Sequence, residues 1–177
     1  PSGCLRGIYC TGAVTIKDVF ESFSLGIGSD GLTGYPLVSL WVKGEDLKSV
    51  AEIDASLSPV MDIALLYFSG LKFTYNPRRL ILDKVVDCSL ESSSGAVSKI
   101  EKDRLYRVVT DYYTASMMRG VMGVTKGLVK ITVRDAEGNP VTNLKNMVIY
   151  TSSGELKGWY AIASGLQQQK TISGYEY

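Results

Sequence analysis

Histidine is absent from this 177-residue chain. Imidazole is the side chain that most often acts as a general base, metal ligand or catalytic-triad member near neutral pH. A self-contained hydrolase would have to rely here on carboxylates, lysine, cysteine or tyrosine. The composition therefore argues against a complete active site of the usual kind within this chain.

Long apolar runs are also missing. The longest, Ile63–Phe68, is far shorter than the roughly 20 residues that a membrane-spanning helix needs, so no membrane span is expected. There is no signal peptide and no starting Met, and the chain opens abruptly with Pro-Ser-Gly-Cys-Leu-Arg-Gly. We expect this sequence to be a fragment of a longer protein.

Neither sign of charge is in excess, and cysteine is scarce. Lys and Arg number 19 against 18 for Asp and Glu, which gives no electrostatic case for DNA, RNA or an anionic membrane surface as a partner. The three cysteines, Cys4, Cys10 and Cys88, cannot all pair within the chain, and we interpret them as small buried thiols. Acidic residues such as Asp83 and Asp111 lie on separate elements, so no metal site is predicted.

What is present is the pattern of one folded domain of mixed class, residues 1–177. Helix signals begin at Thr15, Gly44, Asp111 and Ser153, the first with Asp18 in a capping-box position. Alternating or β-branched runs predict strands over Leu37–Val42, Ala64–Tyr75, Leu80–Leu90, Leu105–Thr110, Gly127–Arg134 and Asn146–Thr151. Helices and strands intermix without a strict βαβ period, which favours an α+β fold with mixed β-sheets layered with helices.

Four segments carry motifs in a fixed order. A glycine turn with Leu5-Arg6 precedes a Gly-x-x-Thr helix entry, and a strand runs into Val42–Leu47 with its Lys-Gly-Glu-Asp-Leu. Ser69–Tyr75 reads Ser-Gly-Leu-x-x-Thr-Tyr, and Leu105–Thr110 contains Tyr-Arg-Val. Together, over residues 1 to about 125, they resemble the C-terminal domain of the 5′-nucleotidase and UDP-sugar hydrolase family.

The resemblance implies that catalysis and substrate binding belong to two separate domains. In that family a separate N-terminal metallophosphatase domain holds two divalent metal ions and a catalytic His-Asp pair, and the C-terminal domain binds the nucleoside and supplies arginine to the phosphate. This chain would then hold no cofactor and would not hydrolyse a nucleotide or other phosphoester alone. The missing histidine agrees with that division. The resemblance also implies an extracytoplasmic location, in a periplasm or at a cell surface.

Two residues are the main binding candidates. The resemblance places Arg6 on the substrate phosphate, where a guanidinium can bind two oxygens and stays charged. It places Tyr113 as one face of the family's base-stacking sandwich, a contact that contributes about 1–3 kcal/mol per base. The alternatives are a surface arginine and a tyrosine that belongs to the core.

Two positions depart from the family pattern. Leu25, a third substrate-binding candidate, falls where the family has the other stacking aromatic; leucine can pack against a ring but has no π face. Met117-Met118-Arg119 falls where the family has Gly-Gly-Asp, whose carboxylate binds the ribose hydroxyls; Arg119 has no acceptor. Arg119 would favour a more anionic substrate, or it is simply solvated on a helix.

Three hypotheses follow from these patterns. The first is the recognition domain of a nucleotide or phosphoester hydrolase. The second is a degenerate nucleotidase-like domain that now serves structure or protein contact. The third, an independent enzyme using Asp, Glu and Cys4, has no support from the spacing of these residues.

Overall fold

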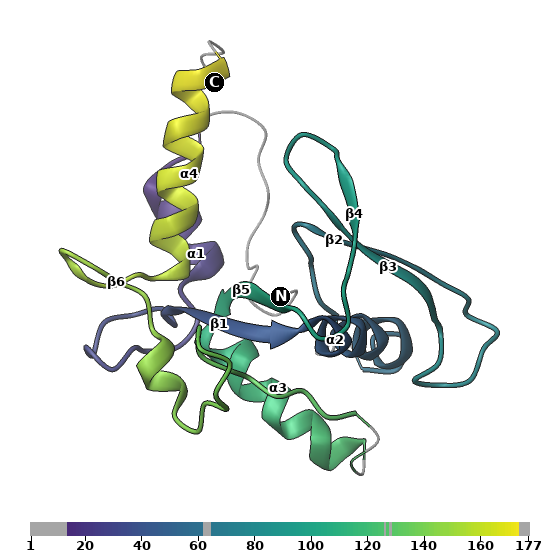
Figure 1. Cartoon of the computed structure of the whole chain (residues 1–177). Coiled ribbons are helices and arrows are strands. Elements are labelled where there is room, and N and C mark those ends of the chain that lie inside the picture. Colours follow the sequence, from purple (N-terminus) through teal and green to yellow (C-terminus); the bar gives the residue numbers. More distant parts are fainter. Residues whose placement is uncertain (1–13, 62–64, 126, 128, 174–177) are drawn as a thin grey trace. The chain divides into compact units, whose positions relative to one another are not determined.

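A computed structural model of the chain describes residues 14–61, 65–125, 127 and 129–173 (Figure 1). Helices and short antiparallel sheets intermix, so the α+β prediction is confirmed. The elements are α1 (Ile16–Phe23), β1 (Leu37–Lys43), α2 (Gly44–Leu57), β2 (Leu71–Tyr75), β3 (Val85–Glu91), β4 (Val97–Lys99), β5 (Leu105–Asp111), α3 (Tyr112–Val124), a 3-10 helix η3 (Leu144–Met147), β6 (Tyr150–Thr151), β7 (Gly154–Glu155) and α4 (Gly158–Ser173).

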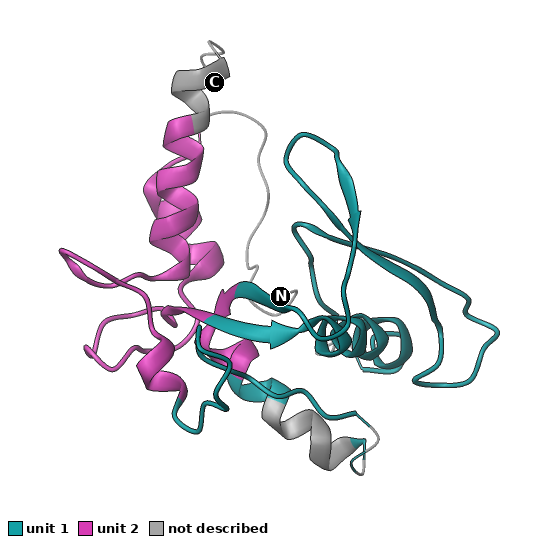
Figure 2. Ribbon diagram, viewed as in Figure 1, with its two compact units in different colours: residues 1–2, 40–108, 116–143 teal, residues 3–39, 109–115, 144–177 magenta. Residues whose placement is uncertain are grey.

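The chain divides into two compact units (Figure 2). Unit 1 contains Leu40–Val108 and Ser116–Asn143. Unit 2 contains Val109–Ala115 and the described parts of residues 3–39 and 144–177. Each of β1, β5 and α3 has its first residues in one unit and its last residues in the other. Strand β1 pairs with β5.

Unit 1 is built from α2 and the antiparallel sheet β2-β3-β4. The small side chains of Ala51 and Ala55 on α2 let Val85 of β3 pack closely, and all three are buried. Leu71 and Phe73 of β2 pack against this cluster from alternate positions along the strand, as the period of two requires. This apolar contact holds the sheet to the helix.

A buried carboxylate adds a polar link between α2 and β3. Glu52 is 7% exposed, and its two oxygens accept the backbone N–H groups of Lys84 at 2.9 Å and Val85 at 2.6 Å. These hydrogen bonds occupy donors at the start of the strand that would otherwise be buried without a partner.

Unit 2 packs α1 against α4. Thr15 caps α1 through a capping box with Asp18, as predicted, and the helix buries Val19. The ring of Phe20 meets Trp159 of α4 edge to face, with 5.3 Å between the centroids. The aromatic contact therefore joins α1 and α4, which lie far apart along the sequence.

Several predicted elements differ in extent. The strand predicted over Leu80–Leu90 begins only at Val85, because Leu82 has φ 65° and this left-handed residue interrupts the extended run. The strand predicted over Ala64–Tyr75 is confirmed only from Leu71, and that over Asn146–Thr151 only as Tyr150–Thr151.

Two predictions on the C-terminal third are wrong. No strand forms among the described residues of 127–134. Arg134 makes only isolated bridges, one of them with Trp41. The carbonyl of Val133 accepts the N–H of Val141, which lies across the turn that follows it. The last helix begins at Gly158 rather than at Ser153, since Gly154 and Glu155 form β7.

Candidate functional site

Two tyrosines of unit 2 stack on each other. Tyr113 is the second residue of α3 and Tyr35 immediately precedes Pro36 at the entry to β1. Their ring centroids lie 5.7 Å apart with 22° between the planes, and both residues are half-buried. The main chain fixes this meeting, because the N–H of Tyr112 donates to the carbonyl of Pro36 at 2.8 Å.

The start of α3 is held by a side-chain cap. Asp111 accepts the backbone N–H of Thr114 at 2.9 Å and its hydroxyl at 2.6 Å. A carboxylate in this place satisfies a donor that the first turn of a helix leaves unpaired. The direction in which Tyr113 leaves the helix is therefore set locally.

Tyr35 also contacts the backbone at residues 25 and 26. Its N–H donates to the carbonyl of Leu25 at 2.8 Å, and a Cβ added to Gly26 would overlap the tyrosine ring. Gly26 has φ 80°, a conformation that glycine adopts without cost. Leu25 and Tyr113 thus both lie next to Tyr35, a residue that the sequence reasoning did not select.

The geometry of the pair limits what can lie between the rings. An aromatic ring inserted between two others needs about 3.5 Å on each side, or roughly 7 Å in all. The observed 5.7 Å is too short for a nucleobase. A base would have to stack outside the pair or separate the two rings.

The structure does not test the remaining sequence candidates. Arg6 lies outside the described residues. Arg119 lies on α3, and its side chain is outside the described part of the structure. Met117, from the same motif, is 43% exposed. The site predictions for these residues stay predictions.

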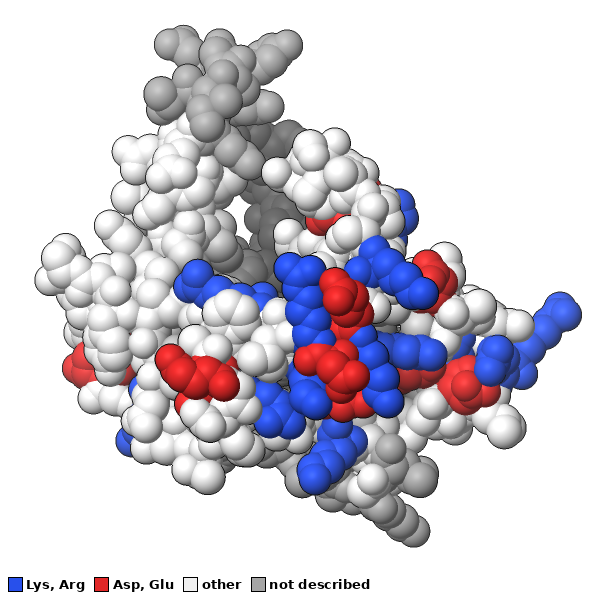
Figure 3. Space-filling model, viewed as in Figure 1, with Lys and Arg blue, Asp and Glu red and all other residues white. Residues whose placement is uncertain are grey.

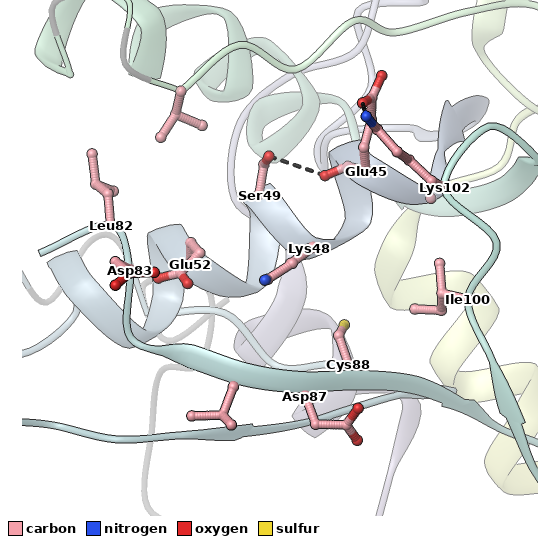
Figure 4. A pocket seen from close by; sticks show the side chains of 13 residues that line it. Glu45, Lys48, Ser49, Glu52, Leu82, Asp83, Asp87, Cys88, Ile100 and Lys102 are labelled. Atoms are coloured by element: carbon pink, nitrogen blue, oxygen red, sulfur yellow. Dashed lines mark hydrogen bonds and ion pairs between the residues drawn. The ribbon is translucent and has the colours of Figure 1, made fainter. Parts of the chain in front are cut away.

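A separate cavity of about 500 Å³ lies within unit 1 (Figure 4). Its lining includes Lys48 of α2 and Asp87 and Cys88 of β3, and the Cys88 thiol points from the strand toward the helix. Burial, followed by the charge of Asp87, raises the pKa of the Cys88 thiol, while Lys48 lowers it. The thiol is therefore protonated near neutral pH and is a poor nucleophile.

Charges around this cavity are largely compensated. Lys102 lies 3.5 Å from Glu45, and nearby Lys43 lies 3.4 Å from Asp103. On the face drawn in Figure 3, Lys and Arg lie side by side with Asp and Glu. Neither an anion nor a cation is favoured there by charge alone.

The described residues include neither a cluster of metal ligands nor a membrane-spanning helix. Within these ranges, no three His, Cys, Asp or Glu side chains come together as a metal site would require. None of the described helices combines the length and apolar character needed to cross a bilayer.

Comparison with known protein families shows to which family the chain belongs. A family model described as "5′-nucleotidase, C-terminal domain" matches residues 2–126, more than half of the chain. The chain belongs to this family. The matched range agrees with the extent of the four sequence motifs and contains Arg6, Leu25, Tyr113 and Arg119.

Solved structures agree on the 5′-nucleotidase C-terminal fold. The chain is similar to a 5′-nucleotidase precursor from Thermus thermophilus, with TM-score 0.65, 18% identity, and coverage of 95% of this chain and 27% of that one. It is also similar to the NAD nucleotidase NadN of Haemophilus influenzae, with TM-score 0.53, 21% identity, and coverage of 71% and 21%. This chain thus spans about a quarter of each relative's length. No curated protein matches it.

Proposed function

We propose that this chain is the substrate-recognition domain of a 5′-nucleotidase-type phosphoester hydrolase acting in nucleotide breakdown. The observation that carries the proposal is the family match over residues 2–126, since that range contains every residue of the proposed site. Arg6 binds the substrate phosphate through its guanidinium. Tyr113, with Tyr35 behind it, offers an aromatic surface to the base.

Hydrolysis itself would belong to an N-terminal domain with two divalent metal ions. The solved relatives are about four times as long as the part that this chain covers, which leaves room for such a domain in a protein of their size. The chain's own contribution is to orient the nucleotide, and we place the whole protein outside the cytoplasm.

The proposal is tested by titrating the full-length protein that carries this chain with AMP, UDP-glucose and inorganic phosphate. Saturable binding of AMP is expected. Tyr113→Ala should weaken AMP binding about tenfold to a hundredfold, the loss of one stacking contact, and leave phosphate binding unchanged. Tyr150→Ala, which removes a 64% exposed tyrosine of β6, is the matched control and should change neither.

A second candidate is a degenerate domain with a structural role. The 5.7 Å separation of Tyr35 and Tyr113 favours it, because the pair is closed to a base between the rings. Here Arg6→Ala would leave the activity of the full-length protein unchanged. A thousandfold fall in rate for Arg6→Ala would exclude this alternative.

A further inference from the structure

The loop that delivers Tyr35 is a small hairpin, residues 25–35. Its two ends are joined by main-chain hydrogen bonds from Tyr35 N–H to Leu25 O and from Gly34 N–H to Gly26 O, each 2.8 Å long. An antiparallel bridge lies inside these bonds. A displacement of the hairpin tip is therefore transmitted to Tyr35 at its base.

The hairpin tip is held by a buried ion triad. Lys157 Nζ lies 2.7 Å from Asp30 Oδ1 and 2.7 Å from Glu155 Oε2. The side chains of Lys157 and Glu155 are 5% and 2% exposed, and that of Asp30 is 24% exposed. The second oxygen of Glu155 accepts the N–H of Ser29 at 3.1 Å, a further bond to the tip.

The contacts within the triad favour the charged forms of Lys157 and Asp30. Burial acts to lower the pKa of Lys157, but hydrogen bonds to Asp30 and Glu155 outweigh it and raise that pKa. The hydrogen bond from Lys157 lowers the pKa of Asp30. Moving the hairpin tip away from Lys157 would break the 2.7 Å Asp30–Lys157 contact, whose ammonium is 5% exposed and has little access to water as a replacement partner.

The main chain of Lys157 also borders Tyr35. Pro36 forms a bridge with Lys157, and the N–H of Gly158 donates to the carbonyl of Tyr35 at 3.4 Å. Lys157 therefore contacts the hairpin at both ends: its ammonium holds the tip, and its backbone lies beside the residue whose ring stacks on Tyr113.

We propose that Lys157 and Asp30 are positioning residues for the Tyr35–Tyr113 pair, because their ion pair fixes the hairpin that sets Tyr35 against Tyr113. The consequence for substrate rests on the proposed function, in which this pair meets the base. The expected effect on the stacking of the two rings does not depend on the proposed function.

The test uses the full-length protein labelled with fluorotyrosine. Fluorine NMR signals of Tyr35 and Tyr113 are assigned with Tyr35→Phe and Tyr113→Phe, and AMP affinity is measured on the unlabelled variants. In Lys157→Met and Asp30→Asn both ring signals should move toward their unfolded positions, and AMP binding should weaken at least tenfold. Lys157→Arg should restore part of both. Lys102→Met, which breaks an exposed ion pair, is the control and should change neither.

Asp30→Asn keeps the buried Lys157–Glu155 pair and so remains informative if Lys157→Met does not fold. Unchanged ring signals in folded Asp30→Asn would overturn the proposal. Ring signals that move in a protein that never binds AMP would support the positioning role and count against the proposed function. If the variants bind AMP tightly and their ring signals do not move, the result would support the proposed function and count against the positioning role.

Discussion

Gly28 shows how little space surrounds the ammonium of Lys157. A Cβ at this position would collide with Lys157 Nζ and with the carboxylate of Glu155. We expect Gly28→Ala to destabilise the protein by about 2–4 kcal/mol, because the methyl group can fit only by opening a buried ion pair. Urea unfolding monitored by circular dichroism measures the change.

The matched control is the same substitution where there is room. Gly165 lies in α4, and a Cβ there would meet no atom within 4 Å. Gly165→Ala should stabilise by about 0.5–1 kcal/mol through lower unfolded-state entropy. Equal effects at the two glycines would contradict the close packing at Gly28.

For single residues, the sequence predicted hydrogen bonds between near neighbours better than contacts between residues far apart along the chain. The Thr15–Asp18 capping box needs only four consecutive residues, and it was found correctly. Tyr35 was missed because its partner Tyr113 is far away along the chain, and only the fold brings them together. The available signal was an aromatic residue between Gly34 and Pro36, in a loop otherwise rich in glycine.

Between elements, α2 and β3 depend on Glu52. Replacing Glu52 by Ala leaves two backbone N–H groups without acceptors in a buried place. The expected loss is about 2–4 kcal/mol in the free energy of unfolding. Glu45→Ala, at an exposed ion pair on the same helix, should cost no more than about 1 kcal/mol. A smaller loss at Glu52 than at Glu45 would refute the role of this carboxylate.

The first turn of α2 makes stability depend on pH. Burial raises the pKa of Asp46 despite hydrogen bonds from Lys43 and Thr132. The folded state therefore holds a proton over a range in which the unfolded state has lost it, so Asp46 favours folding more as the pH falls through its raised pKa. Relative to Asp46→Asn, the wild type should gain stability on acidification from neutral pH. Urea midpoints measured across that range check the sign; a constant difference would be the contrary result.

Element prediction succeeded where hydrogen bonding is local and failed where it is tertiary. The helix entry at Gly44 was predicted correctly, and the structure adds the reason for glycine, since a Cβ there would strike the backbone of Glu101. The run Val129, Ile131 and Val133 alternates and is buried as a strand would be. No ladder forms along the described part of that run, because Val133 bonds within its own turn, which periodicity cannot reveal.

For the whole molecule, the two units provide a test of cooperativity. Each contains one of the two tryptophans, Trp41 in unit 1 and Trp159 in unit 2. Because β1, β5 and α3 each continue from one unit into the other, we expect one shared transition. Urea unfolding of Trp41→Phe and Trp159→Phe, each followed by its remaining fluorophore and by circular dichroism, should give coincident curves within each variant. Distinct midpoints for the two probes of one variant would show separate folding units.

The enclosure of Lys157 has a chemical consequence. Acylating reagents attack an unprotonated, accessible amine, and this nitrogen is neither while the hairpin is closed. Surface lysines such as Lys17, 79% exposed, would be acetylated first. The rate at which Lys157 is modified would therefore report how often the loop opens, and mass spectrometry could follow it on the native protein without any substitution.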